Sequence, residues 1–372
     1  MPRSAVSTVC WSLEMSKALI AMSGGVDSSV AALLMKNAGF ECIGVTMKLH
    51  DSAGETYSEK ACCTASDAED ARSVCVKLGM PYYVFNFTTD FARDVIEKFV
   101  HSYEIGETPN PCIDCNRYLK FDRLYKRAKE LGCDYITTGH YARVEQDEKT
   151  GRYLLKKSLN VAKDQSYVLY FLTQEQLAHT KFPLGDYADK SDVRRIAENN
   201  FLINANKHDS QDICFVPDGD YARFIREYTG KTYPEGDFLL TDGSVIGRHS
   251  GVIGYTIGQR KGLGIAYSEP LYVCEKSVEK NTVTLGTSGE LMSTELTARD
   301  FNLIALPEPP KEPLRVAVRT RYHAKEAPAS AIFNADGTVT VRFDEPQRAI
   351  SPGQAAVLYD GDVVVGGGVI CS

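Results

Sequence analysis

The pattern of apolar residues changes near residue 230, and this change limits the possible folds of the chain more than any other feature. Before it, apolar runs of strand length alternate with amphipathic stretches of helix length, starting with Lys17–Met22 and Asp27–Ala38. This alternation predicts a doubly wound parallel α/β sheet with its ligand at the carboxyl ends of the strands. After it, short β-like runs separated by Asp-Gly turns predict small β domains, with a β-barrel at the C-terminus.

The length of 372 residues is enough for several domains. We predict an N-terminal extension at 1–16, expected to be disordered, an α/β catalytic domain at 17–220, a small central β domain at 221–290 and a C-terminal β-barrel at 291–372. The proline-rich run LPEPPKEP (306–313) is interpreted as a linker and offers a second place for the last boundary.

Composition narrows the class of protein. The 11 cysteines are an odd number in a long chain, which disfavours a secreted disulfide framework and favours a reducing cytoplasm. No apolar run reaches the roughly 20 residues of a membrane helix, and the N-terminus lacks the apolar core of a secretion signal. Because the net charge is −7, a nucleic acid would have to bind a local basic patch.

The segment SGGVDSS (23–29) joins the first predicted strand to the first predicted helix. Its glycines let backbone N–H groups approach a ligand, and its serines and the helix N-terminus add donors, which is typical of a phosphate cradle. A glycine turn with serine caps is the simpler alternative. The segment resembles the SGGxDS loop of the ATP pyrophosphatases (PP-loop enzymes), which hold ATP while a substrate oxygen is adenylated. In that case Asp27 would organise Mg²⁺ or orient the loop.

The segment TPNPCIDCNRYLKF (108–121) places Cys112 and Cys115 before a basic helix predicted at Asn116–Leu131. Two prolines stiffen the loop. If Asn116 caps the helix, Cys115 stands beside a helix N-terminus, where the dipole favours a thiolate. One face of this helix can gather Arg117, Lys120, Arg123 and Arg127. Such a face is either a solvated surface or a site for a phosphate backbone.

A third segment, HDSQDICFV (208–216), holds Cys214 between two apolar residues. A lone cysteine in such surroundings is more often packed in a core than reactive. The nearby His208, Asp209 and Asp212 are too loosely spaced to define a metal site.

Several segments follow one another in the order found in the tRNA-specific 2-thiouridylases, which the chain resembles from about residue 17 to its end. They include SGGVDSS, TPNPCIDCNRYLKF, TTGHYAR (137–143), KDQSYVLY (163–170), HDSQDICFV and YTIGQRKGLGI (255–265). The resemblance implies a PP-loop α/β domain, a small central β domain and a C-terminal β-barrel. It also implies an ATP-dependent enzyme that replaces the C2 oxygen of the wobble uridine in tRNA anticodons with sulfur and releases AMP and pyrophosphate.

Matching positions imply the residues of the site. The ATP phosphates would contact Ala21, Met22, Ser23, Gly24, Gly25, Val26, Asp27 and Ser28, and Met47 and Gly139 would line the rest of the nucleotide pocket. The target base would meet Asn110, Pro111 and Cys112. Positions near tRNA are His140, Lys163, Asp164, Gln165, Arg321, Tyr322 and Gln354. The sequence departs from a common form of the family at Cys112, where some members have Asp.

The implied chemistry uses two thiols. Cys214 would carry a persulfide received from a sulfur-carrier protein, and Cys115 would release or transfer that sulfur, leaving a Cys115–Cys214 disulfide. Alternatively, Cys112, Cys115 and Cys214 would ligate a [4Fe–4S] cluster in a thiolase with the same ATP activation. Another PP-loop ligase would need neither cysteine, and an RNA-binding β module without catalysis would explain residues 230–372 but not the first half. A zinc site is disfavoured, because no second C-x-x-C pair accompanies the first.

Overall fold

The computed structural model describes residues 16–50, 65–207 and 213–372. Its first part folds around a five-stranded parallel sheet in the order β3-β2-β1-β4-β7. The strands are β1 (Lys17–Ala21), β2 (Glu41–Lys48), β3 (Tyr82–Asn86), β4 (Tyr135–Thr137) and β7 (Thr180–Lys181).

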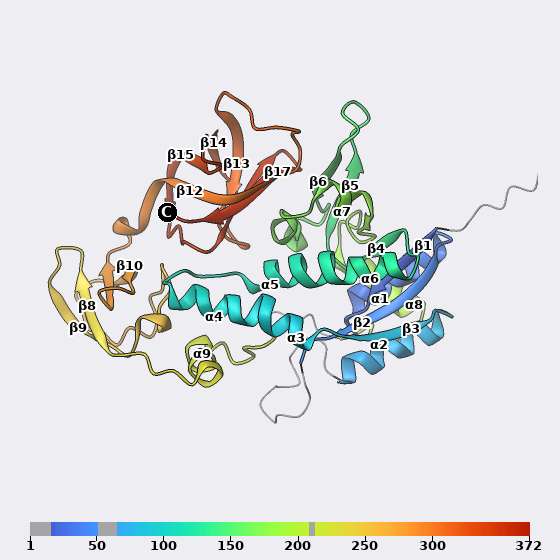
Figure 1. Ribbon diagram of the computed structural model, residues 1–372, viewed down its shortest axis with the longest axis horizontal. Coiled ribbons are helices and arrows are strands. Elements are labelled where there is room, and N and C mark those ends of the chain that lie inside the picture. The colour runs from blue at the N-terminus through green and yellow to red at the C-terminus, as the bar shows by residue number, and fades with distance from the viewer. Residues whose placement is uncertain (1–15, 51–64, 208–212) are drawn as a thin grey trace, which may run out of the picture.

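Helices cover both faces of this sheet (Figure 1). Ala18 and Ile20 of β1 pack into one hydrophobic cluster with α1 (Val26–Asn37), α2 (Ala65–Lys77) and α8 (Lys190–Asn199). Leu19, which points the other way, joins a second cluster with the helices of residues 88–130. Successive residues of a buried strand therefore pack into opposite layers, and the predicted doubly wound fold is confirmed.

The helices of the second layer form two long rods that each contain a π-helical segment. They are α3 (Thr88–Phe91), η1 (Ala92–Ile96) and α4 (Glu97–Glu104), then α5 (Pro111–Asp114), η2 (Cys115–Leu124) and α6 (Tyr125–Glu130). The prediction that the second rod begins at Asn116 is wrong. Asn110 is the N-cap, because its side-chain oxygen accepts a hydrogen bond of 3.2 Å from the Cys112 N–H, and Pro111 takes the first helical position.

The central β domain contains α9 (Tyr221–Thr229) and a four-stranded sheet in the order β10-β11-β8-β9. Its strands are β8 (Gly236–Leu240), β9 (Val245–His249), β10 (Tyr272–Ser277) and β11 (Thr282–Gly286), with short 3₁₀ turns η5 (Val252–Gly254) and η6 (Gly289–Leu291).

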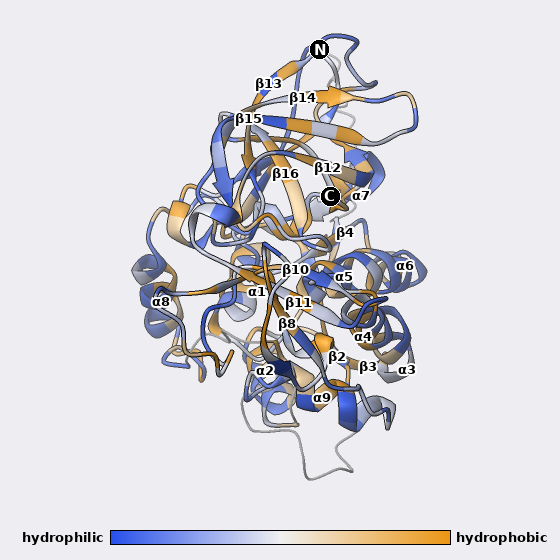
Figure 2. Cartoon of the chain, turned by 90° about the vertical axis from the view of Figure 1, so that its left-hand side faces the viewer, coloured by the Kyte–Doolittle hydropathy of each residue, from blue (hydrophilic) through white to orange (hydrophobic). Residues whose placement is uncertain are grey.

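The C-terminal barrel is closed by pairing between its first and last strands. The strands are β12 (Met292–Leu303), β13 (Leu314–Arg319), β14 (Ala327–Phe333), β15 (Val339–Arg348), β16 (Ala355–Asp360) and β17 (Val363–Ile370). The run LPEPPKEP lies between β12 and β13, so it connects two strands of one barrel, and its interpretation as a linker between domains is wrong. Figure 2 shows hydrophobic residues along β16 and hydrophilic residues along the outer helix α6.

The first domain also contacts the barrel directly. The hairpin of β5 (Ala142–Gln146) and β6 (Tyr153–Lys157) adds to the barrel sheet through the pair Lys156 and Val363. The segments η3 (Val161–Lys163), η4 (Ser166–Leu169) and α7 (Gln174–Ala178) follow the hairpin. Within the described ranges no helix is both long and apolar enough to cross a membrane.

Candidate active site

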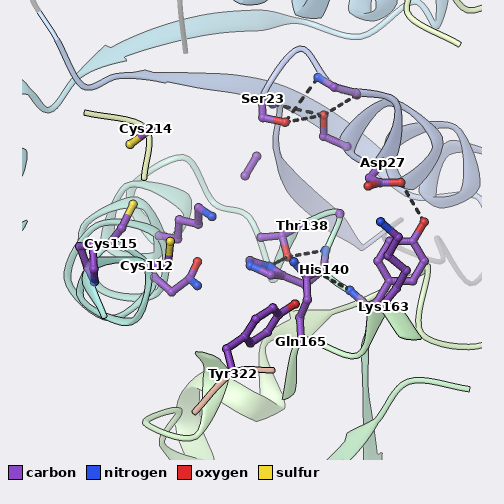
Figure 3. Close-up of a pocket in the computed structure, with 18 of the residues that line it drawn as sticks. Ser23, Asp27, Cys112, Cys115, Thr138, His140, Lys163, Gln165, Cys214 and Tyr322 are labelled. Atoms are coloured by element: carbon purple, nitrogen blue, oxygen red, sulfur yellow. Dashed lines mark hydrogen bonds between the residues drawn. The ribbon is translucent and has the colours of Figure 1, made fainter. Parts of the chain in front are cut away.

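A cleft of about 850 Å³ opens at the carboxyl ends of β1, β2 and β4, where a doubly wound sheet binds its ligand. Figure 3 shows three cysteines on one side of the cleft and Ser23 and Asp27 on the other. Most of the residues predicted for the site line this cleft. Five of them do not: Gly24, Asn110, Arg117, Arg321 and Gln354.

The SGGVDSS loop is held in shape by its own serines. Ser28 Oγ lies 3.2 Å from the Ser23 N–H and 3.2 Å from Ser23 Oγ, and it donates to the Gly25 carbonyl at 3.0 Å. Gly24 has φ +74°, and a Cβ there would overlap the backbone of Asp67. The loop therefore needs glycine at this position, and it presents its backbone at the start of α1, as a phosphate cradle requires.

Gly139, two residues beyond the end of β4, packs against this loop. A Cβ on Gly139 would lie 2.7 Å from the Ser28 nitrogen and 2.8 Å from the Asp27 carbonyl carbon. Real Cβ atoms do not approach backbone so closely, so the TTGH segment can pack against the loop only with glycine here. Met47, at the end of β2, is buried and lines the same end of the cleft.

Asp27 is bonded through both carboxylate oxygens. The Tyr141 hydroxyl donates to Oδ1 at 2.8 Å, and Lys190 Nζ from α8 lies 2.7 Å from Oδ2. These contacts tie the start of α1 to two distant segments. Of the two roles expected for Asp27, they favour orienting the loop over binding Mg²⁺.

Two residues that sequence reasoning missed fasten the chain just before the Cys214 segment. The Asn204 amide donates to the Gly24 carbonyl at 2.9 Å and to Ser29 Oγ at 2.8 Å. Lys207, which lines the cleft, pairs with Asp67 at 2.7 Å and Asp70 at 2.6 Å on α2. Partial burial lowers the pKa of Lys207, but the hydrogen bonds and charges of these two carboxylates together outweigh it, so that the pKa is raised. No local pattern signals these contacts, because their partners are far away in the sequence.

The corrected helix start changes the surroundings of the two thiols in TPNPCIDC. Cys112 lies in the first turn beside the N-cap and is exposed, whereas Cys115 lies in the second turn and is half-buried. Asn116 is 3% exposed inside the helix, so it does not cap it. The argument that a cap at Asn116 places Cys115 at the positive end of the helix therefore fails. Both thiols nevertheless line the cleft.

Cys214 is half-buried and also lines the cleft, so it is not a simple core residue. The next residue, Phe215, is 2% exposed and packs edge-on against Phe91 and Phe99 of the first helical rod, with ring centroids 5.8 Å and 5.1 Å away. This aromatic cluster anchors the segment that carries Cys214. His208, Asp209 and Asp212 lie outside the described residues.

His140 lies in the wall of the cleft as a neutral imidazole. Burial, and then the positive charge of Lys120, hold its pKa well below the ordinary value. Its Nδ1 lies 2.7 Å from the hydroxyl of Thr138. The imidazole is therefore a polar but uncharged part of the cleft wall.

The remaining residues expected near tRNA fall into two groups. Lys163, Gln165 and Tyr322 line the cleft, and Tyr322 reaches it from the barrel (Figure 3). Asp164 also lines the cleft, but it is only 5% exposed and its carboxylate pairs with Arg319 at 3.0 Å.

Arg321 and Gln354 also bond within the protein. Arg321 donates to the carbonyls of Ile257 and Ala349, and Gln354 donates to those of Thr108 and Pro109.

The basic helix is only partly available for phosphates. Arg127 pairs with Glu130 at 2.6 Å, and Arg123 lies 3.5 Å from Asp90. Within the described residues neither Arg117 nor Lys120 forms an ion pair with a carboxylate. The predicted set of four cations therefore reduces to two at the end nearest the cleft.

In the described ranges, no group of three His, Cys, Asp or Glu side chains lies close enough together to hold a metal ion. The three cleft thiols are the right donors for an iron–sulfur cluster, but in this conformation they do not form a ready-made site.

Comparison with known proteins identifies the family. The tRNA methyl transferase HUP domain matches residues 16–218, the tRNA methyl transferase PRC-barrel domain matches 222–287, and the aminomethyltransferase β-barrel domain matches 293–370. A tRNA-specific 2-thiouridylase MnmA from Clostridioides difficile is 51% identical over 95% of this chain and 98% of its own length. The chain belongs to the tRNA-specific 2-thiouridylase family.

Further relatives agree with this placement. The tRNA-specific 2-thiouridylase MnmA of Acetivibrio thermocellus is 51% identical over 95% of this chain and 99% of its own length. A solved 4-thiouridine synthetase–RNA complex with bound ATP is 16% identical, with a TM-score of 0.35 over 57% of this chain and 50% of that chain, which is too distant to support an argument. Family membership confirms the predicted resemblance, the fold class and the class of enzyme.

Proposed function

We propose that this chain carries out ATP-dependent 2-thiolation of the wobble uridine in tRNA anticodons. One observation carries the proposal beyond family membership: the SGGVDSS cradle and the three cysteines Cys112, Cys115 and Cys214 line a single cleft. A uracil carbonyl oxygen is a poor leaving group until it is adenylated. Activation and sulfur delivery must therefore act on the same carbon, in the same cleft.

The nucleotide end of the cleft would hold the ATP phosphates. The backbone from Ser23 to Ser28 surrounds an open cradle, and Gly139 leaves it unobstructed. A substrate oxygen would attack the α-phosphate, so that pyrophosphate leaves and AMP follows. Mg²⁺ would accompany the phosphates, as it does for most nucleotides, while Asp27 fixes the loop through Tyr141 and Lys190.

The cysteine end would deliver the sulfur. The terminal sulfur of a Cys214 persulfide attacks C2, and AMP leaves with the former C2 oxygen. The Cys115 thiolate then attacks the Cys214 sulfur and breaks the S–S bond. The products are 2-thiouridine and a Cys115–Cys214 disulfide, which an external thiol reductant returns to two thiols. Cys112 neither forms nor breaks a bond in these steps, and it would contact the base.

The cluster mechanism remains the main competitor of this proposal. It needs Cys112, Cys115 and Cys214 to gather around iron, and the described residues hold no such group.

Two partners belong to the proposal. One is a tRNA with a wobble uridine, guided by Arg117, Lys120 and Lys163. The other is a sulfur-carrier protein that loads Cys214. A cytoplasmic location is also part of it, because thiols that must return to the reduced form need a reducing compartment.

The direct test is mass spectrometry of tRNA after incubation with the chain, ATP, Mg²⁺ and a sulfur donor. We expect one oxygen-to-sulfur exchange at the wobble uridine, with AMP and pyrophosphate formed in equal amounts. Formation of ADP, or sulfur at another nucleotide, would refute the proposal.

A further inference from the structure

A loop of the C-terminal barrel forms hydrogen bonds with residues 108 and 109, in the segment 107–109 that leads into the helix of Cys112 and Cys115. The Thr108 N–H donates to the Pro352 carbonyl at 2.8 Å. The Gln354 side-chain amide donates to the Thr108 carbonyl at 2.8 Å and to the Pro109 carbonyl at 3.3 Å. Three backbone groups of the catalytic domain are therefore held by two residues of another domain.

Two further contacts join the barrel to the same segment. Arg299 of β12 contacts both carboxylate oxygens of Glu107, at 3.0 Å and 3.2 Å. Gly353, with φ +88°, lies so close to the segment that a Cβ would stand 2.8 Å from the Thr108 nitrogen. The barrel loop is thus shaped to fit against residues 107–109.

The barrel loop is itself fixed from the other side by Arg321. One guanidinium nitrogen of Arg321 shares its two hydrogens among three acceptors: the Ala349 carbonyl at 3.0 Å, Ser351 Oγ at 2.5 Å and the Ile257 carbonyl of the central domain at 2.9 Å. Ser351 is 1% exposed. The loop of residues 349–354 is therefore a junction of all three domains.

This segment lies immediately before Asn110, Pro111 and Cys112, the positions expected to contact the base. Asn110, the next residue, caps the helix through the Cys112 N–H, and Pro111 begins the helix. A shift of residues 108 and 109 would move the cap, and with it Cys112 and Cys115 at the cleft.

We propose that Gln354 is a positioning residue, which sets the base-contact segment and the cysteine helix through the backbone of Thr108 and Pro109. This inference rests on the proposed function for its effect on rate. Its structural part stands on the hydrogen bonds alone.

The test replaces Gln354 by Met, which keeps the length of the side chain and removes the amide donor. The matched control is Gln347→Met on β15 of the same barrel, where the amide donates only to the nearby Glu345 carbonyl. Three quantities are measured: hydrogen exchange at the Thr108 amide, the affinity for tRNA, and the single-turnover thiolation rate at saturating tRNA.

We expect the Thr108 amide of Gln354→Met to exchange at least tenfold faster than in the wild type. The thiolation rate should fall by roughly 10- to 100-fold, because small displacements of reacting groups are costly. The affinity for tRNA should stay within about twofold, and Gln347→Met should match the wild type in all three quantities.

Other results would overturn the inference. Unchanged exchange would show that Gln354 does not hold the segment. A fall in tRNA affinity with a normal rate at saturating tRNA would make Gln354 a tRNA contact. Arg299→Met, which removes the contact with Glu107 in the same segment, should speed exchange and lower the thiolation rate as well. Unchanged values in Arg299→Met would also contradict the proposal that the barrel holds this segment.

Hydrogen exchange needs neither ATP nor tRNA. A wild-type chain that fails to thiolate tRNA would refute the proposed function, while exchange in Gln354→Met would still decide whether the barrel holds the segment.

Discussion

The nucleotide end of the cleft and the cysteine end are assembled in different ways. The nucleotide end is built around one strand–loop–helix unit, in which Ser23 and Ser28 bond to each other, and distant residues such as Gly139 pack against that unit. The cysteine end combines a helix that carries Cys112 and Cys115, a separate segment with Cys214, and the barrel. Phosphate binding can thus be encoded locally, whereas the sulfur chemistry depends on how distant segments are brought together.

The largest effect should come from removing a thiol at the cysteine end. Cys115→Ser and Cys214→Ser should each lower thiolation by more than about 1,000-fold, because a hydroxyl can neither carry a persulfide nor form the disulfide. Cys112→Ser should keep a substantial fraction of the activity. Thiolated tRNA measured after digestion checks all three variants.

The same variants separate the persulfide mechanism from the cluster mechanism. If Cys112→Ser is as inactive as the other two, and the wild type purified without oxygen holds about four irons per chain, the three thiols are cluster ligands. Persulfide loading should be lost in Cys214→Ser alone.

The next largest effect should come from filling the nucleotide cradle. In Gly139→Ala the new Cβ meets the backbone of Asp27 and Ser28, which cannot give way easily. We expect ATP affinity to fall by about 100-fold. Gly289→Ala, where nothing lies within 4 Å of the new Cβ, is the control. Equal ATP affinity in the two variants would remove Gly139 from the nucleotide site.

The difference between the two ends also explains what the sequence could predict. The position of the SGGVDSS loop is predictable because its turn and the helix that follows lie within a few residues. The start of the cysteine helix was misplaced because both Asn110 and Asn116 are good caps, and only Pro111 favours the earlier one. Asn204 and Lys207 carry no local signal, because their partners belong to α1, α2 and the loop between β1 and α1.

Family resemblance has a different limit. It identifies Arg321 and Gln354 as positions near the site, but it does not say which atoms they bond. The structure shows those bonds within the protein. The small β domains predicted after residue 230 are confirmed, since turn signals separate their strands. The pairing of β12 with β15 and of the β5–β6 hairpin with the barrel could not be predicted, because it joins segments that are distant in the sequence.

A smaller effect is expected on tRNA binding. Arg117→Glu combined with Lys120→Glu should weaken tRNA affinity by well over tenfold and should flatten its salt dependence, whose slope is near −0.9 per phosphate neutralised on a duplex. Arg127→Glu should change less, because Arg127 already pairs with Glu130. Filter binding at several salt concentrations checks this. An unchanged slope in the double variant would place the tRNA elsewhere on the surface.

The smallest effect concerns Asp114, between the two cysteines of the C-x-x-C pair. Burial raises the pKa of its carboxyl to about 6, despite the nearby Lys98 and Arg117. The folded chain therefore binds this proton more tightly than the unfolded chain does, and the charged form costs stability as pH rises from about 4 to above 6, by at most about 3 kcal/mol.

Asp114→Asn should accordingly raise the melting temperature by a few degrees at pH 8, and this gain should shrink as pH falls from 6 to 4. Thermal unfolding at a series of pH values measures it. A gain that is the same at every pH would mean that the charge of Asp114 carries no cost.

The central claim is that Cys115 and Cys214 act as one redox pair at the adenylated base. A single-turnover reaction with a persulfide-loaded chain, ATP and tRNA, run without added reductant, tests it most directly. Mass spectrometry of both products should find one sulfur in the wobble uridine for each new Cys115–Cys214 disulfide. Thiolated tRNA with both cysteines still open to alkylation would contradict this account.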